Sequence, residues 1–212
     1  MEQVLANTSN LDGFEGDLYL KQEIQRLVTL DNIQVIFETG TYLGNTTKQF
    51  ATMVNEVVTV EINQTYFDQA QKSFEGVHHI KNYLGNSPDV MDALLPQYRN
   101  HNMLFYLDAH WGDVCPLKSE LKCIAAHGIM PVIVIHDFLV PGKDFGYDSY
   151  LGQPFTYDWF KPELDAIYGT DQYQYFYNKK AMAAYRGVLF CRRKTFFSKF
   201  MFKIKNLIRV SE

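Results

Sequence analysis

Cysteine, an N-terminal signal and long apolar runs are scarce or absent in this sequence, and each shortage excludes a class of protein. The 212 residues include only three cysteines, without a C-x-x-C pair, so neither a disulfide framework nor a cysteine-based zinc site is expected. No basic segment followed by an apolar run opens the chain, so we expect no secretory signal. No stretch reaches the roughly 18 apolar residues that cross a bilayer. We therefore expect a cytoplasmic protein.

The charge of the chain is unevenly distributed. Hydrophobic residues make up 47% and charged residues 21% of the sequence, which is typical of a globular domain. We expect one domain over residues 1–191 and a basic tail over 192–212, which holds seven Lys or Arg and one acid. The remainder has a net charge of −10. Because such an acidic body repels polyphosphate, no nucleic-acid partner is expected.

The tail combines basic residues with an apolar periodicity. Its apolar residues recur at intervals of three and four, at Phe197, Phe200, Met201, Ile204, Leu207 and Ile208. This spacing predicts a helix with one apolar face and a lysine-rich opposite face, which is typical of a helix on an anionic membrane surface. Residues 192–210 are therefore a candidate for peripheral membrane contact. Packing on the domain or on a partner protein explains the pattern equally well.

Apolar runs alternate with helical periodicity along the rest of the chain. We expect strands at 35–37, 57–62, 77–80, 103–107, 131–135, 173–177 and 188–191. We expect helices at 17–30, from a cap at Asn45, at 63–74, from a cap at Ser87, at 116–126 and at 162–167. Five strand–helix alternations followed by two strands predict an α/β domain with a mostly parallel sheet. The long loop at 139–156 is expected to be functional or mobile.

The first strand leads into a glycine-containing loop, E-T-G-T-Y-L-G-N-T, at residues 38–46. Gly40 and Gly44 permit a tight turn and a close approach to a ligand, and Thr46 lies where a helix N-terminus favours an anionic group. Tyr42 replaces the middle glycine of the G-x-G-x-x-G dinucleotide fingerprint, and no G-K-[ST] motif occurs. With Glu38 before the glycines, the loop suits a cofactor with an amine, a carboxylate and a ribose better than a pyrophosphate.

Two further elements extend this predicted cofactor site. Glu61 ends the second strand, where an acid can accept both hydroxyls of a ribose, although a solvated charge at a strand end is the simpler interpretation. Asn86 and Ser87 follow the third strand and can meet an adenine edge. A helix cap explains Ser87 equally well.

With these motifs, residues 33–191 resemble the class I, seven-stranded α/β methyltransferases that use S-adenosylmethionine (SAM). The run E-x-G-x-Y-x-G-x-T looks like the first motif of the catechol and caffeoyl-coenzyme A O-methyltransferases, and the macrocin O-methyltransferases are related. The resemblance implies a Rossmann-like, doubly wound sheet with an antiparallel terminal strand and SAM as the cofactor.

The fourth and fifth strands end in L-D-A-H-W-G-D and I-H-D-F-L-V-P-G. If these strands are adjacent and parallel, their ends meet above the sheet, and Asp108, His136 and Asp137 can bind a divalent cation. Carboxylates favour Mg²⁺ or Mn²⁺, and histidine shifts the preference toward Mn²⁺, Fe²⁺ or Zn²⁺. A metal lowers the pKa of a bound hydroxyl while a base accepts its proton. His110 beside Asp108 is our candidate base.

The resemblance to the catechol-type enzymes is partial at this point. Their metal is held by an Asp after the fourth strand and an Asp–Asn pair after the fifth. Asp108 matches the first ligand, and His136-Asp137 takes the place of the pair. Alternatively Asp137 matches the Asp, and Phe138, which cannot bind a metal, stands at the Asn position. The catalytic lysine of that family has no secure counterpart in this sequence.

The sequence thus predicts a SAM-dependent O-methyltransferase, metal-assisted, for a sugar or another hydroxylated small molecule. Aromatic residues of the 139–160 region can stack on such an acceptor, namely Tyr147, Tyr150, Phe155, Tyr157 and Trp159, and the acids Asp144 and Asp148 can bind its hydroxyls. A loop packed by its own aromatics is equally compatible. Two other hypotheses are a nicotinamide-dependent oxidoreductase, which the missing glycine disfavours, and a non-catalytic module that docks on a membrane or a glycan-assembly partner. The oligomeric state is open.

Overall fold

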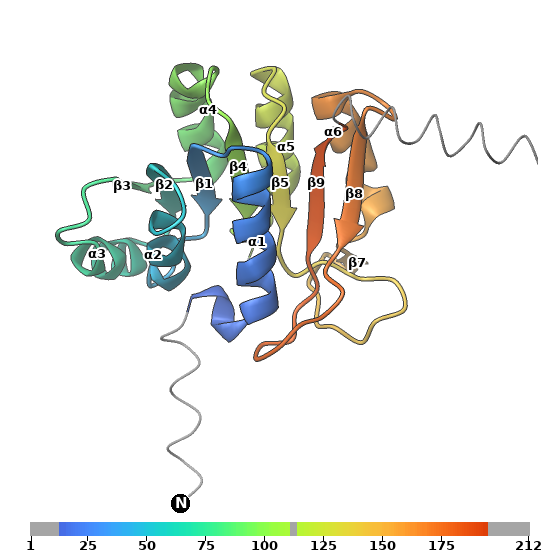
Figure 1. Cartoon of the computed structure of the whole chain (residues 1–212), viewed down its shortest axis with the longest axis horizontal. Helices are drawn as coiled ribbons and strands as arrows, with labels where there is room; N and C mark the ends of the chain where they lie inside the picture. Colours follow the sequence, from blue (N-terminus) through green and yellow to red (C-terminus); the bar gives the residue numbers. More distant parts are fainter. Residues whose placement is uncertain (1–12, 111–113, 195–212) are drawn as a thin grey trace, which may run out of the picture.

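The computed structural model describes residues 13–110 and 114–194, which form a seven-stranded sheet between two layers of helices (Figure 1). The strands are β1 (Val35–Thr39), β2 (Glu56–Glu61), β3 (Ile80–Leu84), β4 (Met103–Leu107), β5 (Val132–Ile135), β8 (Tyr173–Tyr177) and β9 (Leu189–Arg193), and the hairpin β6 (Ser149–Tyr150) and β7 (Gln153–Pro154) is separate. The helices are the 3₁₀ turn η1 (Phe14–Gly16), α1 (Leu18–Leu30), α2 (Asn45–Ala51), α3 (Gln64–Ser73), α4 (Ser87–Tyr98), α5 (Leu117–Ala126) and α6 (Tyr157–Tyr168).

The strand order is β3-β2-β1-β4-β5-β9-β8. Strands β1 to β5 pair in parallel, and β9 is antiparallel to both of its neighbours, β5 and β8. The expected doubly wound α/β fold with an antiparallel strand near its end is therefore confirmed. The order reverses between β1 and β4, which places a crevice at the carboxyl ends of these strands.

Both faces of the sheet are covered by apolar side chains. One face packs against α4, α5 and α6, and the rings of Phe37 and Phe105 stack there at 5.3 Å. The other face packs against α1 and α2, where Phe50 and Tyr106 meet edge to face at 5.3 Å. The central strands are buried along their whole length, which is why they appear in the sequence as continuous apolar runs.

Several predicted boundaries are wrong. Strand β3 begins at Ile80 rather than Val77, since Val77 closes a turn onto the carbonyl of Phe74. Gly44, in a left-handed conformation, caps α2 instead of Asn45. Asn86 occupies the cap position of α4 instead of Ser87. Helix α6 begins five residues before the predicted Pro162.

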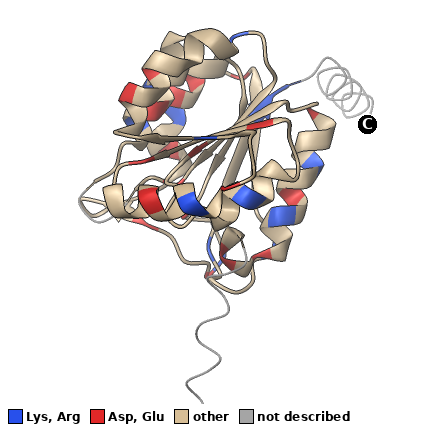
Figure 2. Ribbon diagram, turned by 90° about the vertical axis from the view of Figure 1, so that its left-hand side faces the viewer, with Lys and Arg blue, Asp and Glu red and all other residues tan. Residues whose placement is uncertain are grey.

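The predicted border between domain and tail also differs from the structure. Arg192 and Arg193 belong to β9, because they pair with Gln174 and Tyr173 of β8. Residues 195–212, which carry most of the predicted amphipathic tail, lie outside the described residues. Figure 2 shows Lys and Arg positions at the end of β9 and further charged positions on the helices. Within the described residues, no helix is long and apolar enough to cross a membrane.

Candidate functional site

A pocket of about 550 Å³ opens at the carboxyl ends of β1, β2 and β4, within the usual size range of small-ligand sites. Seven of the eight residues predicted to bind the cofactor line it, namely Glu38, Gly40, Tyr42, Thr46, Glu61, Asn86 and Ser87. The eighth, Gly44, does not. The pocket also reaches Asp108, His110 and Asp137. The topology thus brings the predicted cofactor loop and the predicted chemical cluster into one cavity.

Glu61 is held in place at the end of β2 by two backbone amides. The N–H of Tyr42 donates to its Oε2 at 2.8 Å, and the N–H of Asn63 donates to its Oε1 at 2.9 Å. The residue is 7% exposed. An ionised carboxylate has about four acceptor positions, so these two bonds fix its orientation and leave the others for a ligand in the pocket. The simpler interpretation, a freely solvated strand-end charge, does not describe this arrangement.

The two glycines of the loop make room for other parts of the protein, and Gly40 also lines the pocket. A Cβ on Gly40 would lie 2.5 Å from the carbonyl oxygen of Asp108, and a Cβ on Gly44 would lie 2.5 Å from the ring of Phe74. Both residues have positive φ, at +87° and +76°. Gly40 therefore lets the β1 loop pack directly against the end of β4, which joins the two halves of the pocket.

Glu38 lies beneath the pocket, 1% exposed, and accepts hydrogen bonds from the hydroxyls of Thr47 at 2.5 Å and Thr59 at 2.6 Å. Burial raises its pKa to about 8, although the two hydroxyls act in the opposite direction. The carboxyl group is therefore largely protonated at neutral pH. Its contacts indicate a role in shaping the loop, because Thr47 lies in α2 and Thr59 in β2.

Thr46, Asn86 and Ser87 line the pocket while bonding other parts of the protein. The hydroxyl oxygen of Thr46 accepts the N–H of Phe14 at 2.9 Å, which attaches η1 to the loop. The amide of Asn86 donates to Asp89 at 2.9 Å. The hydroxyl of Ser87 donates to buried Glu120 at 2.5 Å, and burial raises the pKa of Glu120 to about 7. Their predicted contacts with a cofactor stay predictions.

The ends of β4 and β5 are adjacent, as expected, and bring together two carboxylates and two imidazoles. Ligand atoms of Asp108, His110 and Asp137 all lie within 4.8 Å of one another. His136 lies below them, 3% exposed, with its Nδ1 3.5 Å from Asp108 and 3.4 Å from Asp137. That nitrogen has no hydrogen-bond partner among the described residues, so its contacts with the carboxylates are ion pairs. The donor set of oxygen and nitrogen suits a divalent cation.

The charges of this cluster perturb one another. Burial disfavours the charged form of each histidine, but the neighbouring carboxylates outweigh it and raise the pKa of both His110 and His136. Burial alone would raise the pKa of Asp137, yet His136, His110 and Arg186 lower it well below its usual range. Asp137 also has a left-handed backbone, with φ +57°. Perturbed titratable groups gathered in a cavity are typical of functional sites.

The sequence did not reveal Arg186 and Glu15, which border the same cluster. The guanidinium of Arg186 binds both Asp137 and Asp148, and so supplies one positive charge to the acidic cluster. Glu15, in η1, lines the mouth of the pocket, and partial burial raises its pKa. Both residues lie in segments without periodicity, so only the tertiary structure places them here.

The aromatic side chains of residues 139–160 pack against neighbouring elements as well as against one another. Phe155 is 1% exposed and meets the His110 ring edge to face at 4.8 Å, while Tyr157 stacks on Tyr175 at 3.8 Å. Trp159 stacks on Phe155 and receives the ammonium of Lys118 at 4.8 Å. Of the two acids, Asp148 binds Arg186 and Asp144 accepts the hydroxyl of Tyr185 at 3.3 Å. Tyr147, 44% exposed, is still available to an acceptor.

Comparisons with known proteins agree on the fold. No protein-family model and no curated protein sequence matches the chain. An O-methyltransferase from Bacillus cereus, solved in complex with SAH, matches with a TM-score of 0.61, 15% identity, and coverage of 87% of this chain and 85% of that chain. The O-methyltransferase TomG from Streptomyces achromogenes, involved in tomaymycin synthesis and solved with SAM, has a TM-score of 0.59, 13% identity, and coverage of 83% and 80%.

A third match is described as precorrin 8w decarboxylase from Methanobacterium thermoautotrophicum, with a TM-score of 0.51, 12% identity, and coverage of 81% of this chain and 90% of that chain. At identities this low, the TM-scores establish a shared fold and do not establish a shared activity. The resemblance to the class I methyltransferase fold is therefore confirmed, and the activity has to be argued from the site.

Proposed function

We propose that this protein is a SAM-dependent O-methyltransferase that acts on a hydroxylated small molecule, such as a sugar. The observation that carries the proposal is the fixed carboxylate of Glu61, which faces a pocket at the point where the strand order reverses. A carboxylate there accepts the ribose hydroxyls of an adenosine group. The two structural matches solved with SAM or SAH are consistent with this cofactor.

In this proposal the two halves of the pocket have separate tasks. Glu61, the Gly40–Tyr42 loop and the segment Asn86–Ser87 bind the nucleoside, and the cluster at the ends of β4 and β5 binds the acceptor hydroxyl. The direct packing of Gly40 against Asp108 fixes the distance between the two halves. Correct alignment of a methyl donor with an attacking oxygen is a large part of the catalysis of such a transfer.

The carboxylates of Asp108 and Asp137 lie in a cluster whose donor chemistry and spacing fit a divalent cation, and we propose that these two carboxylates hold Mg²⁺ or Mn²⁺. A bound cation would lower the pKa of the acceptor hydroxyl. His110 is positioned to accept the released proton, with its Nε2 3.3 Å from Asp137 and its ring set against Phe155. His136 supports the two carboxylates from below rather than facing the acceptor.

Titration calorimetry of the purified protein with SAM tests the cofactor. We expect binding by the wild-type protein, and no binding by a protein that is shown to be folded would refute the proposal. Nicotinamide dinucleotide serves as the comparison ligand, because stronger binding of that compound would favour an oxidoreductase.

The metal is tested separately by titration with Mn²⁺. We expect Asp108→Asn to weaken Mn²⁺ binding at least tenfold, since it removes a charged ligand, a loss typically worth more than about 1.4 kcal/mol. Asp144→Asn is the matched control, because Asp144 is a nearby loop acid whose oxygen accepts the Tyr185 hydroxyl and which lies outside the cluster. Equal binding by the two variants would contradict the metal site and leave the cofactor proposal intact.

A further inference from the structure

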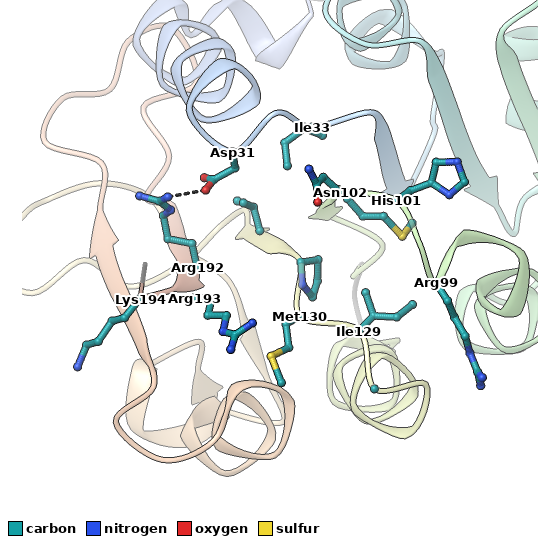
Figure 3. Close-up of a pocket in the computed structure, with 14 residues that line it drawn as sticks. Asp31, Ile33, Arg99, His101, Asn102, Ile129, Met130, Arg192, Arg193 and Lys194 are labelled. Carbon is teal, nitrogen blue, oxygen red and sulfur yellow. Dashed lines mark hydrogen bonds and ion pairs between the residues drawn. The ribbon is translucent and has the colours of Figure 1, made fainter. Parts of the chain in front are cut away.

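A second pocket, of about 770 Å³, opens at the opposite edge of the sheet from the cofactor pocket. It lies between the end of α1, the starts of β4 and β5, and the end of β9, as Figure 3 shows. Its lining includes four basic side chains and one acid, namely Arg99, Arg192, Arg193, Lys194 and Asp31. We call this surface the basic edge.

The basic edge has a net positive charge, because the one acid among its described lining residues pairs with only one of the four basic side chains. Asp31 binds the guanidinium of Arg192, which is 8% exposed and whose Nε has no partner among the described residues. The ammonium of Lys194 donates to a neutral backbone carbonyl, that of Asp171, at 2.9 Å. Arg99 and Arg193 are exposed. This concentration of positive charge stands out in a protein whose residues 1–190 have a net charge of −10.

Two exposed apolar side chains border the same edge. Leu30, the last residue of α1, is 53% exposed, and Met130, before β5, is 47% exposed. Lys194, the last described residue, lines the pocket, and residues 195–212 follow it in the sequence. That segment adds four basic residues, Lys199, Lys203, Lys205 and Arg209, interleaved with large apolar ones. Folded domain and tail therefore offer the same combination of charge and apolar contact.

We propose that the basic edge docks the protein on an anionic lipid bilayer. Basic residues at a negatively charged leaflet are attracted over about a Debye length, and apolar side chains among them enter the interface. Because this contact lies on the folded domain, it fixes the orientation of the domain.

The docked orientation has a consequence for the acceptor. The cofactor pocket lies at the carboxyl ends of the parallel strands and the basic edge at their amino ends (Figure 1). Strands of five residues separate the two by roughly 20 Å. The pocket then faces away from the bilayer, which suits the outer part of a membrane-anchored molecule or a soluble acceptor rather than a lipid head group. The docking itself does not depend on the proposed methyl transfer.

Co-sedimentation of the full chain with vesicles tests the docking. We expect binding to phosphatidylcholine vesicles that contain phosphatidylglycerol, no binding to phosphatidylcholine alone, and loss of binding as salt is raised. Reversing two charges of the basic edge, with Arg99→Glu and Arg193→Glu, should lower the partition coefficient at least about tenfold, because each basic residue contributes a factor of about five. Binding of SAM by the same variant should be unchanged.

The matched control reverses two exposed lysines at the other edge of the sheet, Lys143→Glu and Lys179→Glu. The proposal predicts little loss of vesicle binding in this control. Equal losses in both double variants would mean attraction by net charge alone and would overturn the proposed surface. Normal binding by the Arg99 and Arg193 variant, with all binding lost on deletion of residues 195–212, would show that the tail acts alone and would also overturn it.

Orientation is measured with a polarity-sensitive dye on one introduced cysteine, in a chain whose two partly exposed thiols, Cys115 and Cys123, are replaced by serine and whose third thiol, Cys191, is buried. The probe positions are Met130 at the basic edge and Leu151, 82% exposed, in the β6–β7 turn. We expect anionic vesicles to shift the emission of the dye to shorter wavelength at position 130 only. A shift at position 151, or at neither position, would refute the orientation.

Discussion

Glu61→Gln is the sharpest test of the cofactor site, because it changes one charge and almost no volume. The carboxylate is fixed by the amides of Tyr42 and Asn63 at 2.8 and 2.9 Å, so its other acceptor positions face the pocket. In the variant one oxygen becomes an NH₂ group, which cannot accept a ribose hydroxyl. The bond to the other oxygen loses its charge assistance, which is about half of its strength. A charged hydrogen bond contributes about 1.5–3 kcal/mol, so the expected loss is about 3 kcal/mol, or roughly a hundredfold in the Kd for SAM.

The control for this variant uses the other end of the same strand. Glu56 begins β2, bonds Lys81 and Tyr98, and lies outside the cofactor pocket. Titration calorimetry should give a wild-type Kd for Glu56→Gln and a much weaker one for Glu61→Gln, with both variants folded by circular dichroism. If Glu61→Gln binds SAM within threefold of the wild-type protein, the ribose assignment is refuted, and the proposed cofactor site loses its central contact.

Three predictions concern stability and are measured by denaturant unfolding. The pKa of Glu38 is about 8 in the folded protein against 4.5 ordinarily, so the native state holds an extra proton between these values and wild-type stability falls as pH rises through them. Glu38→Gln should remove this loss. Its free energy of unfolding should equal that of the wild-type protein below pH 4.5 and exceed it by as much as about 5 kcal/mol above pH 8. A difference that does not change with pH would refute the burial argument. Gly40→Ala combines a clash with the Asp108 carbonyl and a positive φ and should cost about 2–4 kcal/mol, whereas Gly142→Ala, with open space around it, should cost only about 1. Asp17→Ala removes a helix cap and the hydrogen bond from the backbone N–H of Met182, and should cost about 2 kcal/mol of stability. Asn63→Ala removes only a helix cap and should cost about 1 kcal/mol. Equal costs would contradict a contribution from the Met182 bond.

The fold was predictable because its strongest signals are local. Buried parallel strands require apolar residues on both faces, so β4 was predicted to the residue. The edge strand β8 was also predicted to the residue, because its run of aromatic residues favours a strand. The apolar face of α1 and its Asp17 cap follow from spacing and side-chain chemistry. Boundaries failed where a residue had two acceptable partners. Ser87 suits a helix cap, but its hydroxyl instead bonds Glu120, 33 residues away.

The site was predictable only in part. Residues at the ends of strands were placed correctly in one pocket, because parallel strands in this topology end at a common edge. Arg186 could not be foreseen, because it follows an irregular segment and reaches Asp137 across 49 positions of sequence. The packing partners of the two loop glycines were also beyond prediction. A positive φ explains a glycine locally, but which atom occupies the space of its missing Cβ depends on the packing of distant segments.

By itself, then, the sequence determined the order and kind of the elements, since helix and strand periodicities are properties of neighbouring residues. It also determined which side chains end the central strands. The tertiary structure alone decided how Glu61 is oriented, which carboxyls are buried enough to hold a proton, and that Arg186 and His136 neutralise the acidic cluster. It alone placed four basic residues at the edge opposite the cofactor pocket. Electrostatics and close packing depend on distances between residues far apart in the chain, and only the folded protein fixes those distances.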